Sequence, residues 1–191
     1  MRGWFGRLIE IVAVTVAVSL SAAWASPAAA QTPPRLAHTI DVWAAGSLGF
    51  ADLGEHGGLA GQFALSTAVD QMVITLRAAG VGEYSEQAPD RTYGDVALLV
   101  GMRATRPKTA APGKFGGTTA SISLGPARLY YNQPPLASSP QRSGMVPAIA
   151  FDADLMAHLR VIGVGVSMFG AAGTNNRYLG VALTLALGKV H

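Results

Sequence analysis

Seven charged or titratable residues lie within apolar segments of the sequence, in which aliphatic residues occupy the alternate positions. The set comprises four aspartates, two arginines and a histidine. They are Asp41, Arg77, Asp95, Arg103, Asp152, Asp154 and His158. Carboxylates, guanidinium groups and imidazole can form ion pairs, hold a small cation or exchange protons. Because four carboxylates face only two arginines, some of the carboxylates need water, a cation or a proton as partner.

Within this set, Asp152 and Asp154 are separated by one residue, so a β-strand would place both carboxylates on one face. His158 lies further along the same face. A metal site would need further ligands at matching depth. Ser167 could offer His158 a hydroxyl, as in barrel enzymes that act on lipid A, but no specific motif surrounds the two residues.

Other sites with a sequence signature are not indicated. The chain has no Cys, which excludes disulfides, thiolate metal sites and a lipid-anchored leader. The histidines are scattered, without the spacing of a zinc site, at His38, His56, His158 and His191. We therefore predict no catalytic residue, no metal site and no cofactor.

β-Strands are predicted to position the charged residues. The clearest runs from Tyr178 to Gly188, where every second residue from Leu179 to Leu187 is a large aliphatic and the residues between are small or carry a polar tip. Seven further segments alternate in the same way, at 40–50, 59–67, 72–79, 93–103, 118–128, 149–159 and 162–169. Pro126 is predicted to limit the end of the fifth segment, because proline cannot donate to the ladder.

The two faces of these strands predict how they are oriented. A soluble sandwich buries its aliphatic residues, whereas here the opposite face is rich in Gly, Ala, Ser and Thr, as the crowded interior of a small barrel would be. We therefore expect the aliphatic face to look outward at lipid and the seven charged residues to form a lumenal polar network. In the opposite case, a soluble barrel would bind a hydrophobic ligand inside.

Composition favours a membrane barrel. Only 13% of residues are charged, and half are hydrophobic, whereas a soluble domain carries about 25% charge. After the leader, no stretch approaches the 18 uninterrupted apolar residues of a spanning helix. The net charge of +3, or +2 without the leader, is too small to indicate nucleic-acid binding.

The first thirty residues are predicted to be a cleavable signal peptide. Arg2 and Arg7 form a basic start, Ile11 to Leu20 is an apolar core, and small residues at 28–30 precede Gln31. The barrel domain would then comprise residues 31–191.

The connections alternate in length. Tight turns are predicted at Val69–Asp70 and Leu159–Arg160, and longer outward loops at 51–58, 80–92, 129–146 and 170–176. The connection 104–117 is long and basic, which indicates either a misplaced strand or a disordered periplasmic loop. The longest outward loop carries Tyr130 and Tyr131 beside prolines, and it could bind a partner. Trp43, Tyr93 and Tyr178 either belong to interfacial aromatic girdles or fill the lumen.

Taken together, the chain resembles small eight-stranded outer-membrane barrels of the outer-membrane protein A, X and opacity type, and uncharacterised outer-membrane β-barrel proteins. The residues that carry this resemblance are the alternating Gly stretch from Ile162 to Val166, Asn175–Asn176, and Leu179 to Lys189. The resemblance implies an outer-membrane location in a Gram-negative-type bacterium, contact with outer-membrane lipid, and insertion by the barrel assembly machinery.

The sequence thus predicts an all-β, eight-stranded antiparallel up-and-down transmembrane β-barrel that is monomeric, non-enzymatic and structural. Its lumen would be filled by side chains, and loops 80–92 and 129–146 could meet a surface ligand. One alternative is a narrow pore, or a barrel that binds a solute or cation through its lumenal carboxylates. A second is the soluble periplasmic barrel with a hydrophobic ligand.

Overall fold

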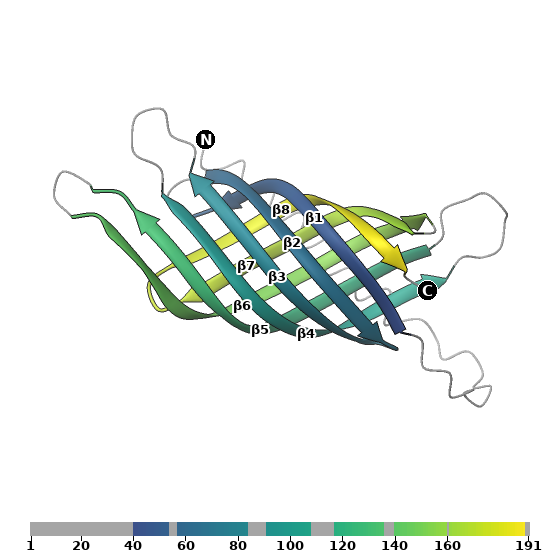
Figure 1. Cartoon of the computed structure of the whole chain (residues 1–191). Coiled ribbons are helices and arrows are strands. Elements are labelled where there is room, and N and C mark those ends of the chain that lie inside the picture. Colours follow the sequence, from purple (N-terminus) through teal and green to yellow (C-terminus); the bar gives the residue numbers. More distant parts are fainter. Residues whose placement is uncertain are drawn as a thin grey trace.

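The computed structural model describes residues 40–53, 57–83, 91–107, 117–135, 140–159 and 161–189, which form eight antiparallel strands closed into a barrel (Figure 1). The strands are β1 (Ile40–Asp52), β2 (Gly57–Val69), β3 (Met72–Glu83), β4 (Thr92–Pro107), β5 (Gly117–Gln133), β6 (Arg142–Leu159), β7 (Ile162–Gly173) and β8 (Arg177–Lys189). Among these residues, no helix is long and apolar enough to cross a membrane. The predicted signal peptide lies outside the described residues.

Each strand pairs with its neighbours in sequence, and the barrel closes where β8 pairs with β1 (Figure 1). At this closure Leu48 lies opposite Leu183, and Ser47 lies opposite Thr184. The up-and-down order predicted from the sequence is confirmed. Closure leaves no unpaired edge over the shared length of the strands, so backbone N–H and C=O groups there find partners within the sheet.

The alternation of side chains gives the barrel an apolar exterior and a polar interior. Leu183, Val164 and Leu98 are 72%, 53% and 52% exposed, whereas Asp152 and Thr184 are 4% and 3% exposed. Successive residues of a strand face opposite sides, and every strand has large hydrophobic side chains exposed on its outer face, although Phe151 and Leu155 on β6 are half-buried. The predicted orientation of the faces is confirmed, and the alternative of a soluble barrel with its aliphatic faces inward is wrong.

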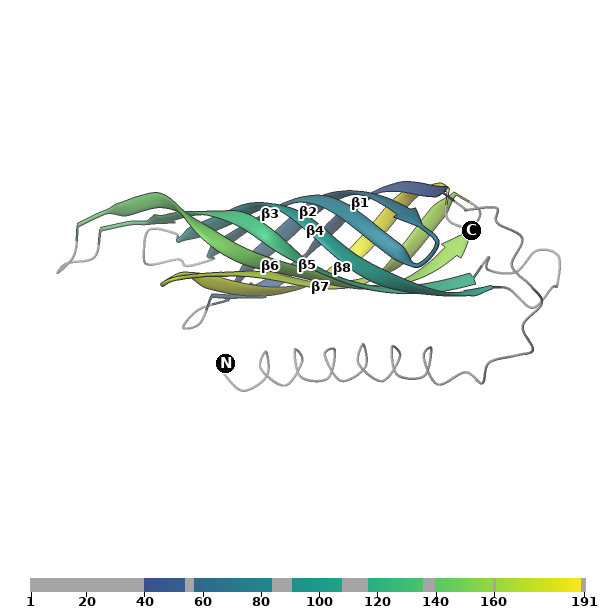
Figure 2. The same ribbon diagram turned by 90° about the horizontal axis from the view of Figure 1, so that it is seen from below.

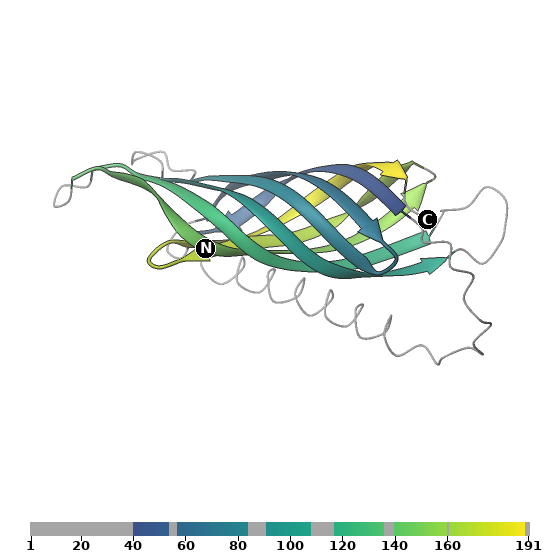
Figure 3. The ribbon, with the colours of Figure 1, turned by 60° about the horizontal axis from the view of Figure 1, so that its bottom comes forward.

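Every strand is longer than the segment predicted for it, β5 and β6 the most. β5 continues through Pro126 to Gln133, and β6 begins at Arg142, so most of the predicted loop 129–146 is a β-hairpin. The pairing of β5 with β4 is interrupted at Gly125 and Pro126, but the strand continues because its pairing with β6 does, with Pro126 opposite Ile149. The hairpin projects beyond the other strands at one end of the barrel (Figures 2 and 3).

Among the other connections, one turn is shifted and the longer loops are shorter than predicted. The turn between β2 and β3 is at Asp70–Gln71, one residue later than expected, and Asp70 adopts a φ of 55°. β3 extends to Glu83 and β4 begins at Thr92, which shortens the predicted loop 80–92. The basic connection is bounded by β4 and β5 as predicted, and residues 108–116 lie outside the described residues.

Inside the barrel, two apolar clusters lie toward opposite ends. The hairpin-end cluster includes Phe169, Leu99, Leu129, Tyr93 and Tyr178, and lies on the side of the projecting hairpin. The turn-end cluster consists of Trp43, Ala45, Ala64, Ala68, Val73, Met156 and Ala186. Buried polar side chains, mostly Ser, Thr, Asp and Arg, lie between and beside these clusters. The strands therefore hold charged groups in a narrow space that is closed by apolar side chains.

Candidate functional site

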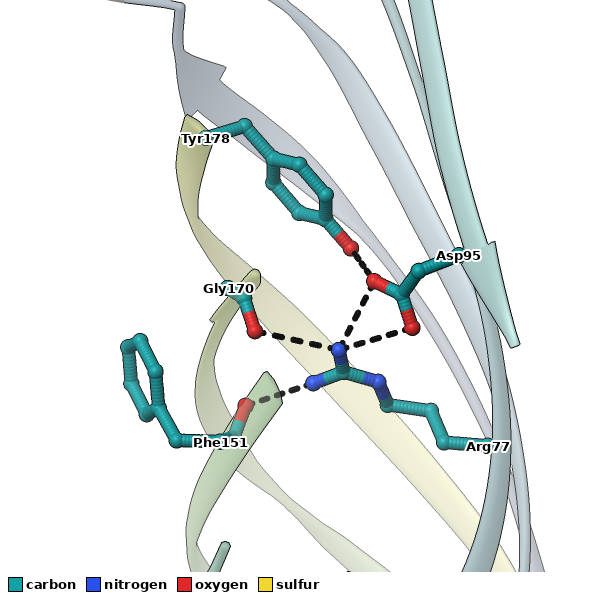
Figure 4. Close-up of polar contacts among 5 residues, drawn as sticks. All are labelled: Arg77, Asp95, Phe151, Gly170 and Tyr178. Carbon is teal, nitrogen blue, oxygen red and sulfur yellow. Dashed lines mark hydrogen bonds and ion pairs between the residues drawn. The ribbon is translucent and has the colours of Figure 1, made fainter. Parts of the chain in front are cut away.

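Arg77 and Asp95 form the most enclosed ion pair of the described residues. Arg77 on β3 donates through one terminal nitrogen, Nη2, to both carboxylate oxygens of Asp95 on β4, at 2.9 and 2.8 Å (Figure 4). Both side chains are inaccessible to solvent. Both residues point into the lumen from adjacent strands. They are not directly opposite each other, because the register partner of Asp95 is Ala79. Arg77 reaches diagonally across the interior to make this pair.

Further contacts fix both partners of this pair. Arg77 also donates to the backbone carbonyls of Phe151 at 2.5 Å and Gly170 at 3.1 Å, from β6 and β7 on the far side of the lumen (Figure 4). Its guanidinium lies 5.8 Å from the ring centroid of Phe169. The hydroxyl of Tyr178 donates to Asp95. Four strands beyond its own are thus tied to one Arg side chain, directly or through Asp95, so this group acts as a cross-brace of the lumen.

A second ion pair lies near the turn end of the barrel. Arg103 on β4 pairs with Asp41 on β1, and its Nε donates to the carbonyl of Asp70 at 2.9 Å. The guanidinium lies 5.9 Å from the ring centroid of Trp43. His158 is buried in the same region and interacts electrostatically with both members of the pair. This arrangement closes the lumen beside the turn-end cluster.

A chain of hydroxyl groups runs from Asp154 on β6 over the neighbouring strands β7 and β8 to β1. Ser167 donates to Asp154 at 2.6 Å, and Ser121 donates to the other carboxylate oxygen at 3.2 Å. The hydroxyl of Ser167 also bonds to Thr184, which bonds to Ser47 at 2.8 Å. Neutral hydroxyls can satisfy a buried carboxylate by hydrogen bonding, but they supply no net positive charge.

Asp152 is placed differently from the other carboxylates. It is almost fully buried, and it lies close enough to Asp154 for the two charges to repel each other. Its Oδ1 atom accepts no hydrogen bond. Gln62 reaches toward it from β2, and the Oε1 atom of Gln62 also lacks a hydrogen-bond partner. The Nε2 atom of Gln62 donates to Ser47 at 3.4 Å, so Asp152 and Gln62 each keep one buried oxygen atom without a donor.

The structure places all seven residues singled out from the sequence on the inner side of the barrel, in three groups. Arg77 pairs with Asp95, Arg103 and Asp41 adjoin His158, and the remaining two aspartates lie between these pairs. The sequence reasoning missed Gln62 and Phe169 as their neighbours. The hydroxyl chain could have been predicted from the Ser and Thr residues at alternate, inward-facing positions of the strands.

Two other sequence expectations are resolved by position. Trp43, Tyr93 and Tyr178 are buried, so they fill the lumen and the interpretation as aromatic girdles is wrong. Ser167 lies opposite Asp154, whereas His158 lies opposite Gly163, about 13 Å further along the same strand pair. Ser167 and His158 thus do not form a nucleophile–base pair.

The comparisons with known proteins agree with this architecture. The chain is similar to the N-terminal β-barrel domain of Pseudomonas aeruginosa OprF, with 12% identity and a TM-score of 0.51 over 77% of this chain and 96% of that one. It is also similar to Neisserial surface protein A, with 7% identity and a TM-score of 0.50 over 78% of this chain and 96% of that one. The chain has the fold of a small outer-membrane β-barrel.

At these identities the likeness concerns the fold alone. No protein-family model matches the sequence, and no curated protein matches it.

Proposed function

We propose that this protein is an integral outer-membrane barrel of a Gram-negative-type bacterium, with a structural role in the cell envelope. The observation that carries the proposal is the apolar exterior. Large hydrophobic side chains on every strand are 38–78% exposed, from Leu48 on β1 to Leu187 on β8. Soluble monomers rarely expose contiguous apolar patches of more than a few hundred Å². An exterior of this kind is favourable in contact with acyl chains.

The closed sheet supports the same proposal. In a bilayer core every backbone polar group needs a partner within the protein, and only helices and closed barrels provide one. The barrel has that closure, because β1 pairs with both β2 and β8. The fold shared with small outer-membrane barrels is consistent with an outer-membrane location.

The lumen favours a structural role over transport or catalysis. An eight-stranded barrel has an interior that side chains can fill. Here Arg77, Phe169 and Met156 are among the largest fully buried side chains, and apolar clusters lie toward both ends. Arg77 bonds across the lumen to β6 and β7, and the Arg103–Asp41 pair joins β4 to β1. We infer that the lumenal charged residues brace the barrel and that the barrel has neither an open conduit nor a catalytic site.

The projecting β5–β6 hairpin is the part best placed to contact a surface partner. It takes the place of the loop predicted at 129–146, and it carries the exposed side chains of Tyr130 and Met145 on its outer face. Gln133 donates to the hydroxyl of Tyr93 and to the side chain of Asn176, which anchors the hairpin to the barrel rim. An anchored hairpin presents a fixed surface to a partner.

Cell fractionation tests the location. We expect the protein in the outer-membrane fraction, extracted only by detergent, with the unboiled form migrating differently from the boiled form on a mild detergent gel. Release by osmotic shock without detergent would overturn the proposal. Conductance in planar bilayers tests the closed lumen, because silent insertion is expected and steady single-channel currents would show that the barrel is a pore.

A further inference from the structure

The middle of the lumen holds more negative than positive charge. Asp95, Asp152 and Asp154 lie near Arg77 there, and Arg77 already binds both carboxylate oxygens of Asp95. Among the residues that the structure describes, neither Asp152 nor Asp154 forms an ion pair with an Arg or Lys side chain. Asp152 is buried and Asp154 is half-buried beside it. Neither has a cationic partner of its own, and burial of such charges is costly unless they are compensated.

Two buried oxygen atoms indicate where the compensating charge would lie. Oδ1 of Asp152 and Oε1 of Gln62 accept no hydrogen bond, although their residues are only 4% and 8% exposed. Gln62 on β2 lies within hydrogen-bonding reach of the Asp152 carboxylate on β6. A buried acceptor oxygen without a donor is unfavourable. A cation beside the Asp152 carboxylate would compensate its charge, and the amide oxygen of Gln62 could become a second ligand by rotation of the amide.

We propose that the lumen encloses one small hard cation, bound by Asp152 and Gln62 with Asp154 beside it. Carboxylate and amide oxygens are ligands that Ca²⁺, Mg²⁺ and Na⁺ prefer, and there is no thiolate or imidazole in this group to select a softer metal. Two surplus carboxylates match the charge of a divalent ion. Ca²⁺ fits best, because it accepts irregular geometry whereas Mg²⁺ demands a near-ideal octahedron.

The protein would supply only part of the coordination shell. The described residues contain no group of three or more His, Cys, Asp or Glu side chains that could hold a metal ion. Calcium sites include amide oxygens and water among their ligands, so water would complete the shell in this polar layer. The hydroxyls of Ser121 and Ser167 hold the Asp154 carboxylate in place beside the site.

The site would be occluded from solvent. The hairpin-end cluster closes the lumen on one side, and Arg103, Trp43 and the turn-end cluster close it on the other. A cation would therefore enter while the barrel closes and exchange slowly afterwards. The cation site depends on the polar lumen and not on the cellular location. Fractionation therefore tests the outer-membrane proposal, and cation binding tests the lumenal site independently of it.

Refolding of the purified chain tests the proposal. The protein is unfolded in urea with EDTA and refolded in detergent with tetramethylammonium, Na⁺, Mg²⁺ or Ca²⁺ chloride at equal ionic strength. The midpoint of the conversion from the folded to the unfolded gel band is then measured. We expect Ca²⁺ to raise this midpoint by about 5 °C or more. We expect the folded protein, after desalting into calcium-free buffer, to retain about one Ca²⁺ per chain by elemental analysis.

Two variants assign the effect to the site. Asp152→Asn removes one charge at nearly constant volume and should abolish both the midpoint shift and the retained Ca²⁺, as should Gln62→Met. Thr75→Val is the matched control, because Thr75 is a buried lumenal hydroxyl that bonds to Ser66. It should lower the midpoint equally in all salts and leave the calcium response intact.

Several results would overturn the proposal. One is an equal midpoint for the wild-type protein in all four salts together with no retained metal. Another is a calcium response of unchanged size in Asp152→Asn, which would place the ion elsewhere on the protein. If neither site variant folds, the metal content of the wild-type protein alone decides, since an ion-free folded barrel excludes an enclosed cation.

Discussion

Arg77 is the side chain on which most of the lumenal contacts converge. Its replacement by Met leaves Asp95 buried with Tyr178 as its remaining donor among the described contacts. Breaking a buried pair by removal of one partner costs about 3–5 kcal/mol, because an uncompensated charge remains. We expect Arg77→Met to lower the free energy of unfolding in detergent by about that amount, measured in a urea titration. The double variant Arg77→Met, Asp95→Leu should recover most of the loss.

The Arg91–Glu83 pair provides the matched control for this prediction. Its atoms are 3.9 Å apart, and the Arg91 side chain is 26% exposed. Glu83 is buried, but the backbone N–H of Arg91 also donates to its carboxylate and remains in Arg91→Gln. With a long ion-pair distance and a partly exposed arginine, we expect Arg91→Gln to change the free energy of unfolding by less than about 1 kcal/mol. Equal losses in Arg77→Met and Arg91→Gln would contradict the role of Arg77 as a cross-brace.

Tyr178 offers a smaller change at the same place. Its hydroxyl donates to Asp95, and its ring packs edge-on against Phe169, with ring centroids 6.2 Å apart and an interplanar angle of 73°. Tyr178→Phe keeps the ring and removes the donor to a buried carboxylate, which costs about 1–3 kcal/mol. The same urea titration measures it. A variant as stable as the wild-type protein would show that Asp95 does not need this donor.

At the scale of single residues, the sequence predicts which side of the barrel a side chain faces but not its partner. Facing follows from a period of two, which can be read within one strand. Partners depend on how strands far apart in sequence are aligned. Asp95 and Tyr178 are 83 positions apart, and no local pattern fixes their relative height. The Asp152–Gln62 contact across the lumen was missed for the same reason.

At the scale of the strands, glycines set how closely neighbours approach. A Cβ atom at Gly101 on β4 would lie 2.0 Å from the carbonyl oxygen of Ile122 and 2.3 Å from the hydroxyl of Ser123, both on β5. At Gly46 on β1 a Cβ would meet nothing within 4 Å. Gly101→Ala should therefore force β4 and β5 apart and destabilise the barrel by about 1–3 kcal/mol.

Gly46→Ala is the control for that prediction, and we expect it to be neutral or stabilising by up to about 1 kcal/mol. Both variants are compared by the temperature at which the folded gel band disappears. If the folded band disappears at the same temperature in Gly101→Ala and Gly46→Ala, then the close approach of β4 and β5 is not required for stability.

The strand cores could be predicted from the sequence, whereas the ends of β5 and β6 could not. Alternation of aliphatic and small residues reports a strand with lipid on one face and a crowded lumen on the other. Beyond Leu129 both faces of β5 become aromatic or polar, as Tyr130, Tyr131 and Asn132 show. The backbone nevertheless stays paired with β6 as far as Gln133. The alternating pattern ends where the strand leaves the lipid and the crowded lumen, although the strand itself continues.

At the scale of the whole molecule, the depth of an exterior side chain should decide what a charge costs there. Leu98 and Met145 are equally exposed, at 52% each. Leu98 lies in the middle of β4 opposite Leu76, whereas Met145 lies on the projecting hairpin opposite Tyr130. In a soluble protein, arginine at either exposed position would be nearly neutral. In a bilayer, arginine costs about 2–4 kcal/mol at the midplane and about 0–1 kcal/mol near the interfaces.

We therefore expect Leu98→Arg to lose about 2–4 kcal/mol of unfolding free energy in phospholipid vesicles, and Met145→Arg to lose less than about 1 kcal/mol. The comparison uses guanidinium titrations followed by tryptophan fluorescence. Each variant is the control for the other, because the two positions have the same exposure and receive the same residue. The difference arises only if an apolar solvent surrounds the middle of the barrel and water surrounds the hairpin. Equal and small losses at both positions would mean that water contacts Leu98, and the barrel would then not span a membrane.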